Sequence, residues 1–222
     1  MPYGVDCKTW VWYNGKRGGD TMEKKLLITG FDPFGGGNVN PSWEAVKLLP
    51  EQIGQYQIHK LAIPTIFGTA AEMILAEAQQ LHPDVIISVG LAGGRDAVTP
   101  ERIAVNIRDA RIADNRGFQP SGDRVVAEGP AAYFSTLPVE KMAEHIRQVG
   151  IPAAVSNTAG TFVCNDVLYT LLHHFDGTTV RAGFIHVPYL PSQGTPNMEL
   201  GDIVKALTAA ILTVDEETAT IE

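Results

Sequence analysis

The sequence predicts an α/β protein, a single-domain three-layer α/β/α sandwich with a mostly parallel, or mixed, central sheet. From Lys25 onward, short β-rich runs alternate with longer amphipathic runs, a pattern typical of a sheet covered by helices on both faces. The chain has 222 residues, of which 45% are hydrophobic, so it is long enough for one substantial core. Because we find no internal repeat and no linker, we expect a single domain over residues 24–222.

Six runs predict strands because they are short and rich in apolar or β-branched residues. They span residues 26–29, 56–63, 84–89, 102–107, 153–156 and 180–187. In the fourth run, Ile103, Val105 and Ile107 recur with a period of two, which predicts a half-buried strand with these three side chains on its buried face.

Five helices are predicted from capping residues and apolar periodicity. Asn40 caps the first and Pro41 stands in its first turn, whereas Thr69 and Glu72 form a capping box for the second. The remaining helices are expected at residues 138–148, at residues 162–174, and from Thr195-Pro196 onward with Ile203, Leu207 and Ile211 on one stripe.

Two segments depart from this alternation. Residues 1–23 have no sustained periodicity, so we expect an N-terminal extension that is disordered, with translation naturally starting at Met22. Residues 109–130 are polar and rich in Gly, Asp, Asn and Arg, which indicates a long surface excursion. Loops of that length are usually functional or disordered.

Composition excludes several classes of function. A net charge of −8 is the wrong sign for electrostatic binding of nucleic acid, and no apolar run is long enough to cross a membrane. The two cysteines, Cys7 and Cys164, leave the body of the chain with a single thiol, so we expect a reducing cytoplasm. The histidines show no metal-binding spacing, so no metal site is expected.

The glycine-rich turn over residues 30–37 joins a strand to a helix, but it lacks the Lys-Ser/Thr of a P-loop and the spacing of a dinucleotide-binding turn. Its unusual feature is a pair of phenylalanines, Phe31 and Phe34, at the carboxyl end of a strand, where open α/β sheets bind ligands. These rings either pack in the core or clamp a flat, uncharged ligand ring.

Cys164 is predicted in the first turn of a helix, where the helix dipole and free N–H groups favour a thiolate. The alternative is an inert buried thiol. His186, near the end of an apolar strand, needs a polar partner, and Glu101 supplies a carboxylate to orient it, giving a nucleophile, a base and an orienting acid. Spacing alone leaves Asp84, Asp109 or Glu128 as alternatives for the acid.

Five separated motifs resemble the pyroglutamyl-peptidase I family, also called pyrrolidone-carboxylate peptidases. They are Gly30-Phe31-Asp32-Pro33-Phe34-Gly35-Gly36, Val39-Asn40-Pro41-Ser42, Pro100-Glu101-Arg102, Gly160-Thr161-Phe162-Val163-Cys164-Asn165 and Phe184-Ile185-His186-Val187-Pro188-Tyr189-Leu190-Pro191. The resemblance runs in order from about Met22 to the carboxyl end.

The resemblance implies a cytosolic, homotetrameric cysteine peptidase that removes N-terminal 5-oxoproline from peptides without a cofactor. It places the nucleophile at Cys164, the general base at His186 and the third triad member at Glu101, with substrate-binding positions at Phe31, Phe34, Asn40, Thr65, Arg111, Ile112, Phe162 and Val163. Leu91 stands where the family commonly has glutamine. The alternative function is a ligand-binding homologue that has kept the pocket and lost turnover.

Overall fold

A six-stranded sheet forms the centre of the computed structural model, which describes residues 24–219. Its strands lie in the order β2 (Gln52–Ile53), β3 (Tyr56–Ile63), β1 (Lys24–Phe31), β4 (Val85–Leu91), β10 (Arg181–Val187) and β5 (Thr99–Pro100). The four inner strands pair in parallel, whereas the two short edge strands pair antiparallel to their neighbours. The predicted mixed sheet is therefore confirmed.

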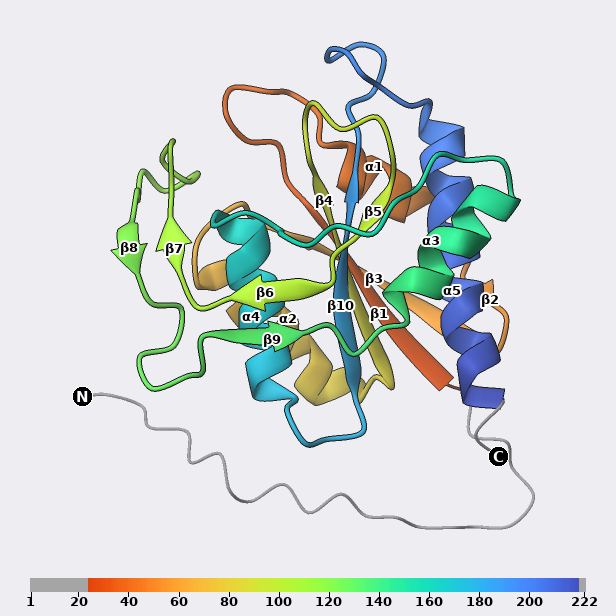
Figure 1. The fold of residues 1–222 in the computed structure, drawn as a ribbon, viewed down its shortest axis with the longest axis horizontal. Coiled ribbons are helices and arrows are strands. Elements are labelled where there is room, and N and C mark those ends of the chain that lie inside the picture. Colours follow the sequence, from red (N-terminus) through yellow and green to blue (C-terminus); the bar gives the residue numbers. More distant parts are fainter. Residues whose placement is uncertain (1–23, 220–222) are drawn as a thin grey trace.

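Helices cover both faces of this sheet and give the predicted three layers (Figure 1). One face carries α1 (Pro41–Leu48), α3 (Val139–Gln148) and α5 (Leu200–Ala219), and the other carries α2 (Thr69–Leu81) and α4 (Val163–His174). Two separate groups of buried apolar side chains fill the spaces between the layers, one on each face. Each helix is thereby fixed against the sheet by burial of its apolar side.

The segment over residues 103–134, which contains the predicted surface excursion, follows β5 and folds against α4. In it, β6 (Ile103–Val105) pairs with β9 (Ala132–Phe134), and β7 (Arg108–Asp109) pairs with β8 (Ser121–Asp123). The strands β6, β7 and β9 all contact α4. This packing places the start of the excursion next to the N-terminal turn of α4, which carries Cys164.

The predicted alternation over residues 102–107 is wrong in its phase. Ile103, Val105 and Ile107 are only half-buried, while Ala104 and Asn106 are buried, and the strand ends at Val105. The small side chain of Ala104 belongs to the apolar group beneath α4, and the amide of Asn106 donates to the carbonyls of Val126 and Gly129. Tertiary contacts therefore override the apolar pattern.

Three other local predictions need correction. Thr69 is the first helical residue of α2 and not its cap, because Gly68 precedes the helix and donates its N–H to Asp166. Residues 153–156 make only isolated bridges, since Pro100 opposite them has no N–H for a continuous ladder. The last helix starts at Leu200 and not at Thr195, because Asn197 and Met198 pair with Tyr189 instead.

The remaining boundaries agree with the predictions to within a few residues, and Asn40 caps α1 by accepting from the N–H of Ser42. Ile203, Leu207 and Ile211 form a buried stripe on α5, as expected. The expected extension over residues 1–23, including the proposed start at Met22, lies outside the described residues.

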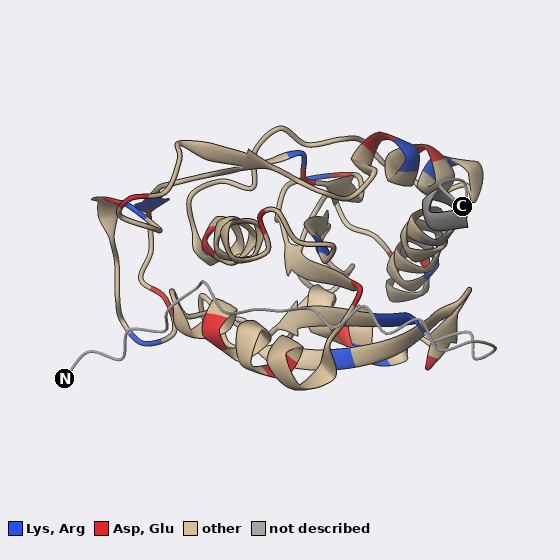
Figure 2. Cartoon of the chain, turned by 90° about the horizontal axis from the view of Figure 1, so that it is seen from below, with Lys and Arg blue, Asp and Glu red and all other residues tan. Residues whose placement is uncertain are grey.

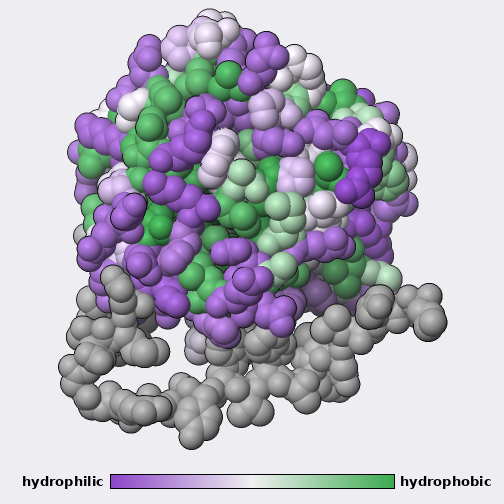
Figure 3. All heavy atoms as spheres, turned by 180° about the vertical axis from the view of Figure 1, so that it is seen from behind, coloured by the Kyte–Doolittle hydropathy of each residue, from purple (hydrophilic) through white to green (hydrophobic). Residues whose placement is uncertain are grey.

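Charged residues of both signs are intermixed along the helices and loops (Figure 2). On the face opposite that of Figure 1, hydrophobic residues are interspersed with hydrophilic ones (Figure 3). Among the described residues, no helix combines the length and the apolar character needed to cross a membrane.

Candidate active site

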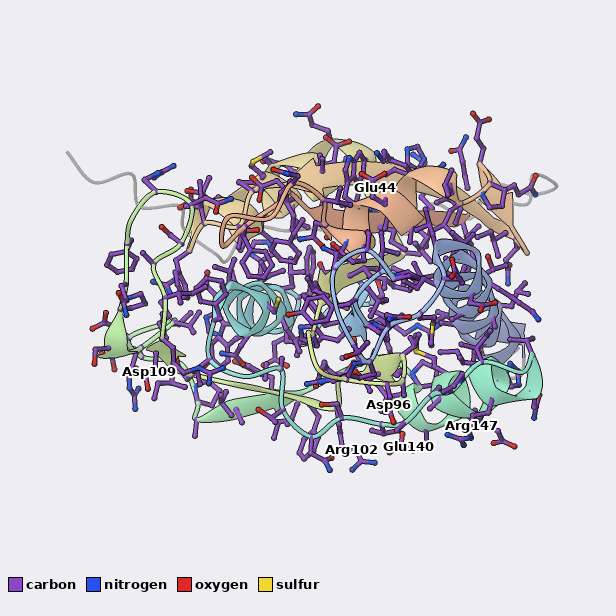
Figure 4. The ribbon with its side chains drawn as sticks, turned by 90° about the horizontal axis from the view of Figure 1, so that it is seen from above. Glu44, Asp96, Arg102, Asp109, Glu140 and Arg147 are labelled. Carbon is purple, nitrogen blue, oxygen red and sulfur yellow. The ribbon has the colours of Figure 1, made fainter. Side chains whose placement is uncertain are left out.

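A cavity of about 550 Å³ opens at the carboxyl ends of the inner strands. Phe31 at the end of β1, Leu91 at the end of β4 and His186 near the end of β10 all line it, as does Cys164 at the start of α4. Figure 4 looks onto this edge of the sheet, with α4 seen along its axis. Ligands of open α/β sheets bind at this edge, so the cavity is where a substrate is expected.

Cys164 is the second residue of α4, after the non-helical Phe162 and the first helical residue Val163. Its sulfur lies beside Gly90 of β4, since a Cβ atom built on Gly90 would be 3.0 Å from Sγ and 2.7 Å from the ring of Phe184. A glycine at this position of the sheet is therefore what leaves room for the thiol.

His186 and Glu101 form a buried hydrogen-bonded pair. Nδ1 of His186 lies 2.7 Å from Oε1 of Glu101, and both side chains are almost completely removed from solvent. The strand register puts His186 opposite Gly90, the residue against which the Cys164 sulfur rests. Glu101 follows β5, whose Thr99 pairs with His186, so the short edge strand delivers the carboxylate to the imidazole.

The other carboxylates that spacing had left open are not bonded to His186. Asp84 precedes β4 at the opposite end of the sheet, where it accepts from the N–H of Lys25. Asp109 lines the cavity from β7 but has an exposed side chain, and Glu128 is exposed in the excursion. Glu101 is the acid that the fold brings to the imidazole.

The protonation states follow from burial. Burial raises the pKa of the Cys164 thiol to about 12, with the charge of Glu101 adding to this effect. Burial also lowers the pKa of His186, although its hydrogen bond to Glu101 opposes the shift. Burial alone would raise the pKa of Glu101, but its hydrogen bond to His186, the charge that His186 carries when protonated, and its hydrogen bonds to Ser156 and Arg95 together lower that pKa. Desolvation therefore opposes the thiolate that the helix N-terminus is expected to favour.

Aromatic rings form the apolar part of the cavity. Phe31 is buried and tilted against Phe184, whereas Phe34 is partly exposed on the turn after β1 and its ring lies 6.1 Å from that of Phe162. All three predicted phenylalanines line the cavity. A core role and a ligand-contacting role are therefore compatible for Phe31, because one part of its ring packs inward.

Asn40 and Thr65 also line the cavity and hold the turn that carries Phe34. The amide of Asn40 donates to the carbonyl of Asp32, and the N–H of Thr65 donates to the carboxylate of Asp32 at 2.7 Å. Asn115 reaches the same carboxylate from the long excursion, at 3.1 Å. The two loops on this side of the cavity are thus joined through one aspartate.

The remaining predicted residues differ in how they face the cavity. Arg111 and Ile112 are exposed and line it from the excursion, and Leu91 lines it with a half-exposed side chain. The side chain of Val163 is fully buried in the core beneath α4 and does not form the cavity wall.

The most informative residue that the sequence reasoning missed is Arg95. It lines the cavity and its guanidinium lies 2.7 Å from Oε1 of Glu101. A charged residue directly after a glycine-rich turn at the end of a buried strand was the available signal. Within the described part of the chain, no group of three or more His, Cys, Asp or Glu residues is arranged to hold a metal ion.

Comparison with known proteins agrees with this geometry. The sequence profile of the pyroglutamyl peptidases matches residues 24–217. The chain belongs to this family. It is 53% identical over 194 residues to the pyrrolidone-carboxylate peptidase of Levilactobacillus brevis, an alignment that covers 84% of this chain and 95% of the relative. It is therefore a cysteine-type peptidase.

Solved structures of the family have the same fold. The crystal structure of pyroglutamyl peptidase I from Bacillus amyloliquefaciens matches with a TM-score of 0.84 at 48% identity, covering 87% of this chain and 95% of that chain. The pyrrolidone carboxyl peptidase from Thermococcus litoralis matches with a TM-score of 0.85 at 37% identity, covering 90% of this chain and 96% of that chain.

Proposed function

We propose that this peptidase hydrolyses the amide bond after an N-terminal pyroglutamyl residue, with Cys164 as nucleophile, His186 as general base and Glu101 as the acid that orients it. The single observation that carries the proposal is the buried 2.7 Å contact between His186 Nδ1 and Glu101 Oε1, at the cavity that also contains the Cys164 thiol. Family membership supplies the substrate class.

The cavity suits a lactam ring. Pyroglutamate has two apolar faces, one N–H, one C=O and no ammonium group, so aromatic rings can cover its faces while backbone groups pair with its edge. The ring centroids of Phe34 and Phe162 are 6.1 Å apart with their planes tilted by 38°, and both rings line the cavity together with Phe31. An ordinary N-terminal residue would bring a charge that these rings cannot solvate.

The protonation states define how the thiol is activated. With the pKa of Cys164 raised to about 12 and that of His186 lowered, the resting pair is a neutral thiol and a neutral imidazole. Because Nδ1 of His186 is held by Glu101, Nε2 is the nitrogen that takes the thiol proton as sulfur attacks the scissile carbonyl carbon.

The reaction then proceeds through a thioester. The tetrahedral oxyanion is stabilised by N–H groups in the first turn of α4, which have no acceptor within the helix. The imidazolium gives its proton to the leaving amine, the C–N bond breaks and the acyl group stays on sulfur. His186 next removes a proton from water, the hydroxide attacks the thioester, and 5-oxoproline and the free thiol are released.

The experiment is hydrolysis of pyroglutamyl, prolyl and glutaminyl amides of one fluorogenic amine, with and without prior alkylation by iodoacetamide. We expect cleavage of the pyroglutamyl amide almost alone, because the other two carry a charged amine and proline also lacks the lactam carbonyl. Alkylation of Cys164 should abolish activity, whereas Cys7→Ser should change neither activity nor inactivation. Similar rates on all three amides would contradict the lactam pocket.

The alternative is a homologue that binds the ligand without turning it over. Stoichiometric alkylation of Cys164 in a protein that shows no hydrolysis of any amide would favour it. Full activity after complete alkylation would instead exclude Cys164 as nucleophile. The homotetramer and the cytoplasmic location implied by the resemblance stay predictions, and light scattering tests the former.

A further inference from the structure

Arg95 connects three parts of the candidate site. Its Nη1 donates to Oε1 of Glu101 at 2.7 Å and also to the hydroxyl of Thr99, and its Nη2 donates to the carbonyl of Thr158 at 3.1 Å. Thr158 belongs to the turn that leads into α4 and Cys164. One guanidinium thus bridges the acid after β5 and the approach to the nucleophile's helix.

The local sequence directs Arg95 to this position. Gly94 has a φ of +86°, a conformation that L side chains rarely adopt, and the N–H of Arg95 closes the turn onto the carbonyl of Ala92 at 3.3 Å. The arginine side chain is 29% exposed whereas that of Glu101 is fully buried. The guanidinium is therefore placed between the buried carboxylate and the open cavity.

Glu101 presents the same oxygen, Oε1, to both His186 and Arg95. An unpaired carboxylate at this depth would be costly, and its charge would oppose formation of a thiolate nearby. We propose, on the basis of the function proposed above, that Arg95 is a positioning residue of the triad. Its positive charge balances that of Glu101, and its two guanidinium nitrogens, one on Glu101 and one on Thr158, fix Glu101 relative to the turn before Cys164.

The charged and titratable groups facing His186 are few. Glu101 follows β5, Arg95 follows β4, Cys164 begins α4, and Asp109 and Arg111 line the outer cavity. Burial is the largest cause of the lowered pKa of His186; Glu101 opposes that shift and Arg95 adds to it. Removing Arg95 is therefore expected to raise the pKa of His186, and removing the charge of Glu101 is expected to lower it further.

The test measures the pH dependence of kcat/KM for a pyroglutamyl amide in five enzymes, all with Cys7→Ser. One has no further change, and the others carry Arg95→Gln, Arg95→Lys, Glu101→Gln or Arg147→Gln. Arg147 is the matched control, because it also donates to a backbone carbonyl, that of Ala153, but lies on α3 away from the cavity (Figure 4). Melting temperatures of all five proteins separate loss of folding from loss of function.

In Arg95→Gln we expect the acid limb of the profile to move up by about one pH unit, at the low end of the effect of a neighbouring charge. We also expect kcat to fall about tenfold with little change in KM, because positioning of the acid acts on the transition state. Glu101→Gln should move the limb in the opposite direction. Arg147→Gln should leave the limb in place even if it lowers the melting temperature.

Arg95→Lys separates charge from geometry, since lysine keeps the charge but lacks the planar fork. It should leave the acid limb near its native position and still lower kcat. An unmoved limb in Arg95→Gln, or an equal shift in Arg95→Lys, would overturn the charge balance. If Arg95→Gln does not fold, a native kcat in Arg95→Lys would overturn the positioning role.

A second readout does not depend on the substrate. The rate of alkylation of Cys164 by iodoacetamide at pH 8 should fall about tenfold in Arg95→Gln. Loss of the positive charge is expected to raise the pKa of the Cys164 thiol by about one unit, which lowers the fraction of thiolate about tenfold. If the native protein hydrolysed no pyroglutamyl amide, the proposed function would fail while this comparison still decided the role of Arg95. Equal alkylation rates would count against Arg95 in either case.

Discussion

The sulfur of Cys164 lies against the backbone of Gly90, 3.0 Å from the point where a Cβ atom on that glycine would stand. Gly90 is also the register partner of His186 on the neighbouring strand. Nucleophile and base are therefore brought together by the absence of a side chain in the sheet between them. This contact lies inside the core, so it limits what can replace Gly90.

Gly90→Ala is expected to lower both stability and activity. The new methyl group would lie 2.7 Å from Phe184 and 3.0 Å from Sγ, and overpacking of this kind costs about 1–3 kcal/mol. Displacing the nucleophile should reduce kcat by about 10²-fold. Gly201→Ala on α5, where nothing lies within 4 Å, is the control and should have native kcat and a Tm that is not lowered, since alanine is favoured over glycine in a helix. Native kcat in Gly90→Ala would contradict the placement of the sulfur.

Glu101→Gln should retain more activity than Cys164→Ala or His186→Ala. The amide oxygen can still accept from Nδ1 of His186, so orientation is kept while the charge is lost, and we expect about a 10²-fold fall in kcat. Steady-state kinetics of the three enzymes on one pyroglutamyl amide make the comparison. If Glu101→Gln proved as inactive as Cys164→Ala, the carboxylate would have to do more than orient the base.

The pH dependence of the native enzyme follows from His186. Burial lowers its pKa below the ordinary 6.5, and only the neutral imidazole can accept the thiol proton. As the pH falls, kcat/KM should therefore reach half its maximum below pH 6.5 and not at it. A profile of kcat/KM between pH 4 and 8, in buffers of constant ionic strength, measures the midpoint. A midpoint well above 6.5 would show that the imidazole is stabilised as a cation.

Leu91→Gln should change KM more than kcat. Leu91 lines the cavity at the position where the family resemblance expects glutamine, and one added hydrogen bond to the lactam is worth about 0.5–1.5 kcal/mol, a factor of about 2 to 10 in KM. A bond made equally in ground and transition states leaves kcat unchanged. Leu48→Gln, at an exposed position of α1, is the control. A changed kcat at constant KM would argue against a binding role.

Local sequence determined the order of helices and strands and most of their boundaries. Asn40 and Pro41 start α1 through contacts within a few residues, and the buried runs of β4 and β10 have no charged residue inside them that would keep them at the surface. The same reasoning identified Cys164, His186 and Glu101 as residues that needed an explanation. It could not choose among the four carboxylates that were candidates for the acid, because separation along the sequence does not give the distance to His186 in the fold.

The tertiary structure decided what depends on burial and on contacts between distant residues. The 2.7 Å contact of Glu101 with His186 joins residues 85 positions apart, and it exists because β5 pairs with β10. Arg95 became part of the site only through the turn that returns it to Glu101. Sequence alone suggested a thiolate at the start of α4, but desolvation by the surrounding core raises the pKa of Cys164, and only the folded chain creates that desolvation.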